Sequence, residues 1–170
     1  MSCRLFKMLR FEKKSIMKIK KLTKSLAIHF SLVFLTLNGI IAQPIQDFSV
    51  KTTSNFVERK TMLDLLRTKI KKEFNQDARF SVNHFLVSGN YAWFTGGVTR
   101  SDGQRIIFPR DSYFDCCHVE ALFEKDSKGK WKIAESNTFS TDVWYTCIGI
   151  RYPSANPKIF TEGAMGDYCE

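Results

Sequence analysis

Residues 85–98 read FLVSGNYAWFTGGV, and this stretch decides the fold. Apolar and aromatic residues lie on both sides of Ser88-Gly89-Asn90, a combination typical of a tight turn. The pattern predicts a β-hairpin whose second strand begins at Tyr91. The pair Gly96-Gly97 indicates a bulge or bend at the end of that second strand.

The strand before this turn follows a period of two, so alternate side chains share a face. One face is expected to carry Phe80, Val82, His84 and Leu86. Two further strands are predicted, at about 114–125 and 131–137. In the first of them, alternation places Cys117 on one face; the residues expected on the other are Cys116, His118, Glu120 and Leu122.

A helical period precedes the hairpin. Apolar residues recur there at steps of three and four, which predicts an amphipathic helix with one buried stripe. The stripe consists of Leu63, Leu66, Ile70 and Phe74. The helix begins near Asn55, and Glu58, three residues later, completes a capping box.

These elements predict an α+β domain in which one long N-terminal helix packs on a curved antiparallel sheet of four to five strands. One face of the sheet meets the helix and the other is partly solvated. Residues 141–170 are expected to form a loop-rich segment that a disulfide ties down.

Residues 1–42 have the layout of a secretory signal peptide. A lysine-rich head leads into an apolar run, and Ala42 precedes the polar start Gln43-Pro44. Met17 is an alternative start. The apolar run is shorter than the roughly 20 residues that a stable membrane span needs, so no stable membrane anchor is expected after cleavage. The prediction is a single exported domain, 43–170, that is periplasmic or extracellular.

The leader also explains the charge of the chain. Of 26 basic and 17 acidic side chains, nine basic and one acidic lie in residues 1–42, which leaves 17 basic and 16 acidic in the domain. Basic surface supplies most non-specific affinity for nucleic acid. A domain with a net charge of +1 is therefore not expected to bind nucleic acid.

Four cysteines remain in the exported domain, an even number in an oxidising compartment. They are Cys116, Cys117, Cys147 and Cys169. The prediction is up to two disulfides, in which Cys116 and Cys117 pair with Cys147 or Cys169, and a bridge between Cys147 and Cys169 is the favoured single bond. A vicinal bridge is disfavoured by its geometry. The alternatives are a metal site built on Cys116 and His118, and a thiolate nucleophile with His84 or His118 as its base.

The hairpin, the stretch VEALFEKDSKGKWKIAESNTFSTDVWY at 119–145 and the late Pro157-Lys158-Ile159-Phe160 resemble small exported bacterial proteins of uncharacterised function. The resemblance covers about residues 56–160. It implies a cystatin-like or nuclear-transport-factor-2-like fold and supplies no catalytic residues.

Because each catalytic or metal interpretation is weaker than its structural alternative, the prediction is a non-enzymatic binding domain without a cofactor or metal, whose partner is a protein or a small apolar ligand. The binding surface is expected on the open sheet face or the C-terminal loop. The residues expected to contact the partner are His84, His118, Glu120, Tyr113, Trp144 and Tyr145. The alternatives are an inhibitor or immunity-type protein and a small hydrolase or isomerase, in which Glu120 pairs with Asp115 or Glu135 as acid and base.

Overall fold

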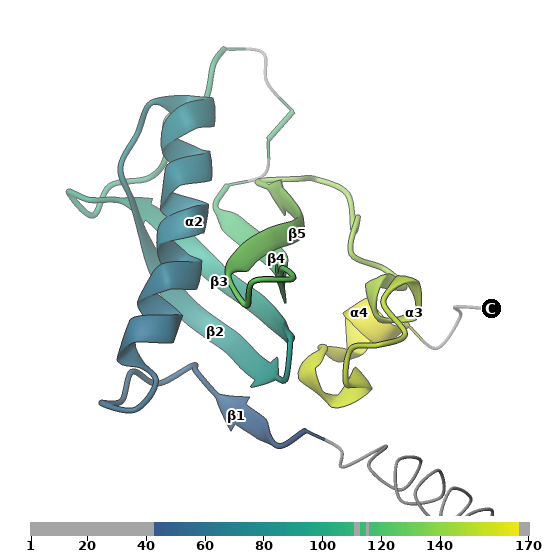
Figure 1. Ribbon diagram of the computed structural model, residues 1–170. Helices are drawn as coiled ribbons and strands as arrows, with labels where there is room; N and C mark the ends of the chain where they lie inside the picture. Colours follow the sequence, from purple (N-terminus) through teal and green to yellow (C-terminus); the bar gives the residue numbers. More distant parts are fainter. Residues whose placement is uncertain (1–42, 111–112, 115, 167–170) are drawn as a thin grey trace, which may run out of the picture. The chain divides into compact units, whose positions relative to one another are not determined.

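The computed structural model describes residues 43–110, 113–114 and 116–166. Over these residues the protein is an α+β domain with one antiparallel sheet of five strands in the order β1-β2-β3-β4-β5 (Figure 1). Its elements are β1 (Ile45–Asp47), α2 (Phe56–Phe74), β2 (Ala78–Ser88), β3 (Tyr91–Arg100), β4 (His118–Lys125), β5 (Trp131–Thr138), α3 (Ile148–Arg151), η1 (Pro157–Ile159) and α4 (Glu162–Met165). None of the described helices is long and apolar enough to cross a membrane. The expected leader, residues 1–42, lies outside the described residues.

The central hairpin forms where the sequence predicts it. Ser88 of β2 pairs with Tyr91 of β3 across a turn of two residues. Gly89, the first of them, has a positive φ of 59°, a conformation that glycine adopts without a steric penalty. The same pairing brings Phe85 opposite Phe94, and both rings are completely buried.

The bulge expected from Gly96-Gly97 lies on the partner strand. β3 runs through both glycines, whereas the register of β2 shifts between Val82 and His84. The shift reverses the alternation within β2: Phe80 and Val82 pack against the same core as Phe85, and Leu86 packs on the opposite side of the sheet. The prediction that Phe80, Val82, His84 and Leu86 share one face is therefore wrong, because strict alternation cannot continue through a bulge.

Helix α2 packs on one face of the sheet and encloses the first of two apolar cores. The buried stripe of the helix is Met62, Leu63, Leu66 and Ile70. It meets the inward side chains of the strands, among which Phe85, Phe94 and Phe123 are completely buried. Phe85 is the centre of this ring packing, with centroids 5.3 Å from Phe94 and 6.1 Å from Phe123. Burial of these large side chains is the main source of stability on this side.

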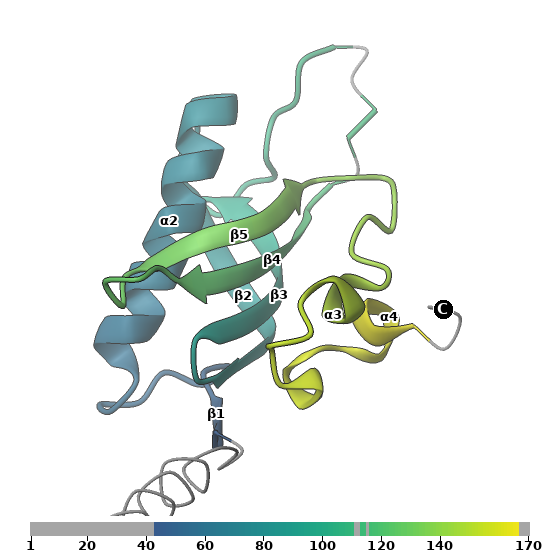
Figure 2. The same cartoon turned by 45° about the vertical axis from the view of Figure 1, so that its right-hand side comes forward.

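The segment after β5 covers the opposite face of the sheet. α3 and α4 lie on this side and α2 on the other (Figures 1 and 2). The buried residues of this second core are Trp93, Leu122, Ile148, Ala155, Ile159, Phe160 and Ala164. This face is covered to a larger extent than the sequence predicts, since its two central side chains, Trp93 and Leu122, have no exposed surface.

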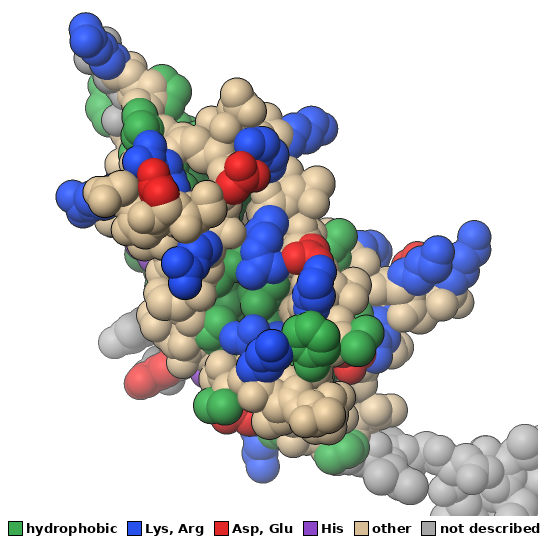
Figure 3. Space-filling view, turned by 90° about the vertical axis from the view of Figure 1, so that its left-hand side faces the viewer, with side chains coloured by type: hydrophobic (Ala, Val, Ile, Leu, Met, Phe, Trp, Pro, Cys, Tyr) green, Lys and Arg blue, Asp and Glu red, His purple; other side chains and the backbone are tan. Residues whose placement is uncertain are grey.

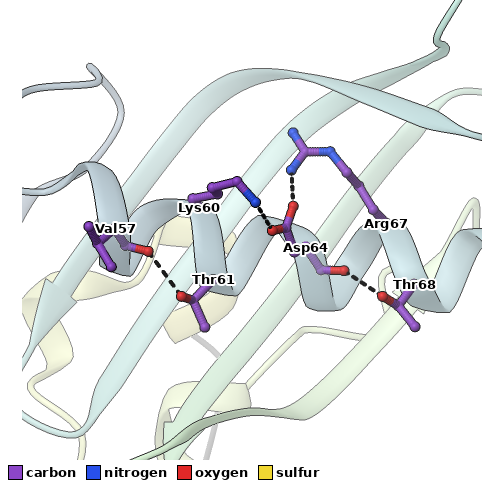
Figure 4. A network of polar contacts seen from close by, with 6 residues as sticks. All are labelled: Val57, Lys60, Thr61, Asp64, Arg67 and Thr68. Carbon is purple, nitrogen blue, oxygen red and sulfur yellow. Dashed lines mark hydrogen bonds and ion pairs between the residues drawn. The ribbon is translucent and has the colours of Figure 1, made fainter.

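The outward side of α2 is charged. Figure 3 shows that basic side chains outnumber acidic ones on this side of the molecule, with hydrophobic side chains between them. Asp64 accepts from both Lys60 and Arg67, and the hydroxyls of Thr61 and Thr68 donate to backbone carbonyls one turn earlier (Figure 4). The hydrogen bond from Lys60 is the largest effect that lowers the pKa of Asp64. Because all three charged side chains are substantially exposed, these pairs contribute little to stability.

Glu58 does not complete a capping box; it joins the helix to the far edge of the sheet. The side chain of Asn55 makes no capping bond to the helix, and its Oδ1 accepts from the backbone N–H of Thr52. Glu58 Oε1 accepts from the indole N–H of Trp131 at 2.8 Å and pairs with Lys125 Nζ at 2.8 Å. The ammonium of Lys125 in turn lies 4.6 Å from the centre of the Trp131 ring.

We expect Glu58→Ala to lower the free energy of unfolding by about 1–2 kcal/mol, because it leaves the largely buried indole N–H of Trp131 without its acceptor. The matched control is Asp64→Ala on the same helix, which breaks two exposed ion pairs and is expected to cost less than about 0.5 kcal/mol. Urea melts of the two variants and the wild type measure both values. Equal losses in the two variants would contradict this account.

Candidate functional site

Four of the six predicted contact residues come together on the second face of the sheet. His118 and Glu120 come from β4, and Trp144 and Tyr145 come from the segment that follows β5. The charge of Glu120 raises the pKa of Tyr145, and the indole of Trp144 lowers the pKa of Glu120, so these side chains are neighbours. We call these four residues the Glu120 cluster.

Strand alternation brings Glu120 into this position. Val119, Ala121 and Phe123 pack toward α2, so His118, Glu120 and Leu122 face the C-terminal segment. Glu120 lies between Thr95 of β3 and Asn137 of β5 in the sheet register. Only 7% of its surface is exposed, whereas the side chain of His118, one pleat away at the start of the strand, is 43% exposed. His118 thus marks the side from which the cluster meets solvent.

Burial raises the pKa of Glu120, because removal from water disfavours the charged form. His118, whose Nε2 lies 3.7 Å from Glu120 Oε1, and the indole of Trp144 oppose this shift without cancelling it. Burial and the charge of Glu120 together raise the pKa of Tyr145. The cluster therefore contains a carboxyl group that retains its proton to higher pH than a solvated glutamate does.

Trp144 differs from the other two described tryptophans in the hydrogen bonding of its indole N–H. The indole N–H of Trp93 donates to Thr161 Oγ1 at 3.2 Å, and that of Trp131 donates to Glu58. Trp144 Nε1 is buried and makes no hydrogen bond of ordinary length and angle, but a weaker hydrogen bond to the carboxyl of Glu120 lowers the pKa of that carboxyl. The buried donor and the buried carboxyl are therefore neighbours.

Three rings form an apolar wall beside these polar groups. The ring centroids of Trp93, Trp144 and Tyr145 are 6.0–6.3 Å apart in all three pairs. Trp93 also contacts Phe160 with a centroid distance of 5.7 Å. The sequence places Tyr145 and Trp144 in a predicted loop, but only the fold shows that this loop returns to the strand that carries Glu120.

The other two predicted contact residues lie elsewhere. His84 Nε2 is 2.6 Å from the backbone oxygen of Ile159, so this histidine fastens η1 to β2. Tyr113 lies in the connection between β3 and β4 and is 92% exposed. Neither belongs to the Glu120 cluster.

The pair of carboxylates expected from Glu120 and Glu135 does not form. Glu135 Oε2 accepts from Arg151 Nη2 at 2.8 Å, and this bond, with one from Tyr152, lowers the pKa of Glu135 despite partial burial. Burial, reinforced by Glu135, raises the pKa of Tyr152 to about 12. The side chain of Glu135 therefore binds Arg151 and connects α3 to β5. Asp115, the other expected partner of Glu120, lies outside the described residues.

The cysteines of the domain lie at different places in the fold. The sulfur atoms of Cys116 and Cys117 are in contact with each other. The pairing of each of them with Cys147 or Cys169 stays a prediction. The alternation argument fails because β4 begins at His118 and the two cysteines lie in the preceding turn, outside the extended strand. Cys147 is disulfide-bonded, and its expected partner, Cys169, lies outside the described residues.

The described side chains offer hydrogen bonding and proton exchange at this site. Among them, no group of three or more His, Cys, Asp and Glu residues could hold a metal ion. A protonatable carboxyl, an imidazole and an indole N–H can orient a bound molecule and exchange a proton with it.

Neither protein-family models nor curated proteins nor solved structures yield a match to this chain.

The raised pKa of Glu120 makes the wild type less stable as the pH rises, and we expect Glu120→Gln to abolish this part of the pH dependence. Because the folded state raises the pKa of Glu120 above its ordinary value of 4.5, it holds this proton where the unfolded chain has released it. The free energy of unfolding therefore falls as the pH rises from 4.5 through the raised pKa, and glutamine cannot ionise.

Urea melts of wild type and Glu120→Gln at about pH 4 and about pH 8 test this expectation. The stability of the variant relative to the wild type should increase with pH. Carboxylates with lowered pKa values, such as Glu124 and Glu135, act in the opposite direction but equally in both proteins. A difference that stays constant between the two pH values would show that the pKa of Glu120 is not raised.

Proposed function

We propose that the protein is a small non-enzymatic exported binding domain whose ligand binds between β4 and the segment after β5. The observation that supports this most directly is the buried carboxyl of Glu120, which lies 3.7 Å from the half-exposed imidazole of His118. The charge of Glu120 also acts on Tyr145, and the indole of Trp144 acts on Glu120. Perturbed ionisable groups gather at functional sites.

The surroundings indicate the character of the ligand. The partly buried rings of Trp144 and Tyr145 suit an apolar body, whereas Glu120 suits a polar headgroup. The side chain of His118, which is 43% exposed, lies where the cluster meets solvent. We therefore propose a small, mainly apolar ligand with a polar end, bound with its headgroup inward.

Small aromatic molecules with different headgroups test this proposal. The chain has three tryptophans, so the indole N–H region of a proton–nitrogen NMR spectrum resolves Trp144 from Trp93 and Trp131 after assignment with Trp144→Phe. At least one probe should shift the Trp144 signal saturably and leave the Trp131 signal in place. If no probe shifts the Trp144 signal, the proposed site is wrong.

We further propose that the domain has a cystatin-like or nuclear-transport-factor-2-like fold and is exported, with its C-terminal segment tied by a Cys147–Cys169 disulfide. The packing of α2 on an antiparallel sheet supports the fold, and the disulfide-bonded state of Cys147 supports the bridge. The signal-like pattern of residues 1–42 supports export.

Intact mass measurement of protein from the exported fraction tests these assignments together. The expected mass is that of a chain beginning at Gln43, and alkylation without a reductant should add no label if all four remaining cysteines are bonded as proposed. Retention of residues 1–42 would contradict export. Labels that peptide mapping places on Cys147 and Cys169 would contradict the Cys147–Cys169 bridge.

A further inference from the structure

The first half of β2 is an open edge of the sheet. β1 pairs with β2 only over residues 86–88, and the backbone pairing ends at Phe85, whose oxygen accepts from the N–H of Phe48 at 2.7 Å. Within the described part of the chain, no strand continues this pairing along residues 78–84, which we call the open edge. An edge of this kind presents backbone N–H and C=O groups to which another extended segment can bind.

Two apolar side chains of the open edge lie on the side of the sheet that α2 covers. Phe80 and Val82 pack against the first core but are only partly buried. Figure 3 shows that hydrophobic side chains lie between basic ones on this side of the molecule. Alternate side chains of an added strand would lie beside Phe80 and Val82, because the side chains of neighbouring strands pair on the same face.

Three arginines lie around these apolar side chains. The guanidinium of Arg67 is 5.5 Å from the centre of the Phe80 ring, and Arg59, two turns earlier on α2, donates to the backbone oxygen of Phe48. Burial lowers the pKa of Arg59, and the positive charge of Arg67 lowers it further. The third, Arg79, is exposed on the open edge itself. The two arginines of α2 thus repel each other, and a carboxylate between them would relieve the repulsion.

The acidic side chains of the described residues do not balance these arginines. Asp64 pairs with Arg67, but it also pairs with Lys60. Among the ion pairs of the described residues, none involves Arg59 or Arg79. The surface beside the open edge therefore carries an excess of positive charge, which is complementary to an acidic partner.

β5, the strand at the other edge of the sheet, has balanced charges. Its two charged side chains have opposite signs, and each has a partner: Lys132 pairs with Glu124, and Glu135 pairs with Arg151. The positive excess is thus a property of the β2 edge, which makes this edge the better candidate for an acidic segment.

We propose that the open edge binds an extended acidic segment of a partner protein, which pairs with β2 as an additional strand. The backbone of the segment bonds to residues 78–84, and its apolar side chains pack beside Phe80 and Val82. Its carboxylates pair with Arg67 and Arg79. The Glu120 cluster lies on the opposite face of the sheet, so this inference does not depend on the proposed small ligand.

Three capped peptides test the inference on the unmodified protein. Glutamate and valine alternate in the first, a heptapeptide that begins and ends with glutamate. The second has lysine in place of glutamate. The third keeps every glutamate and has two consecutive prolines in place of the central valine, so that an N–H is missing on the side of β2 in either register.

Fluorescence anisotropy of the labelled peptides measures their affinities. The first peptide should bind at least about tenfold more tightly than the second, because like charges repel across an interface. It should also bind about tenfold more tightly than the third, since one lost hydrogen bond is worth about this factor. Hydrogen exchange at residues 79–83 should slow when the first peptide binds.

Charge reversal at the open edge identifies the residues responsible. Arg79→Glu should weaken binding of the acidic peptide at least about fivefold, because attraction becomes repulsion. Lys128→Glu is the matched control: it changes the net charge equally, lies in the exposed turn between β4 and β5, and should leave the affinity unchanged. Arg79 and Lys128 are both exposed, so neither variant removes a core side chain.

Each contrary result overturns a stated part of the proposal. Equal affinity for the proline peptide would show that no strand is added, and equal affinity for the lysine peptide would show that the partner is not acidic. Absence of binding by the acidic peptide would overturn the proposal as a whole. Slow exchange at residues 79–83 in the free protein that becomes faster on dilution would show that the edge pairs with a second copy of this chain instead.

Discussion

Replacement of Trp93 by alanine is expected to lower the free energy of unfolding by about 3–5 kcal/mol, the range for truncation of a fully buried large aromatic side chain. Trp93 has no exposed surface and lies at the centre of the second core. Its ring contacts Trp144, Tyr145 and Phe160 at centroid distances of 5.7–6.3 Å. Its N–H also donates to Thr161, so the substitution removes packing and a hydrogen bond together.

The loss should concentrate on one side of the sheet. α2 packs on the opposite face, where the first core contains none of the atoms removed. Hydrogen exchange of wild type and Trp93→Ala should therefore show faster exchange in residues 148–166, while the amides of α2 lose only the protection that global stability controls. Trp93→Phe is the control: it keeps a ring in the core, loses the bond to Thr161, and should cost about 1–2 kcal/mol. A loss below about 1 kcal/mol for the alanine variant would mean that the C-terminal segment is not packed on Trp93.

The parts of the fold that local periodicity determines could be predicted from the sequence. The turn at Gly89 follows from residue type, and the antiparallel sheet follows from alternation and short connections. The two register shifts could not be located, because a bulge depends on how two strands meet and not on either strand alone. The pair Gly96-Gly97 correctly indicated that a bulge lies nearby. The extra residue, however, belongs to the neighbouring strand β2, between Val82 and His84.

The candidate site could be predicted only in part, for a similar reason. Alternation within one strand correctly places His118 and Glu120 on the same side, with Leu122. The contribution of Trp144 depends on the return of a loop across the sheet, which no local pattern encodes. The approach of its N–H to Glu120 is a property of the assembled fold. The facing of Cys116 and Cys117 could not be predicted because the strand was expected to begin before Cys116, whereas it begins after Cys117.

Gly96→Ala is expected to destabilise the protein by about 3 kcal/mol, the upper part of the range for overpacking, because two rigid obstacles meet at this position. A Cβ at Gly96 would lie 2.5 Å from the backbone oxygen of Ser81 and 2.8 Å from the ring of Phe94. The oxygen belongs to β2, beside its bulge, and cannot move without separating β2 from β3. The ring is completely buried against Phe80 and Phe85 and has no space to turn into.

The neighbouring glycine offers a matched control with a different expected outcome. A Cβ at Gly97 would lie 2.6 Å from the side-chain oxygen of Ser81, and the Cβ of Ser81 is 4.0 Å away. Ser81→Ala should therefore relieve most of the cost of Gly97→Ala and none of the cost of Gly96→Ala, since the latter clash involves backbone. Urea melts of the wild type, the three single variants and the two double variants give both coupling energies. Rescue of Gly96→Ala by Ser81→Ala would show that β2 does not approach β3 as closely as the bulge requires, and the face assignment of Phe80 and Val82 would then be wrong.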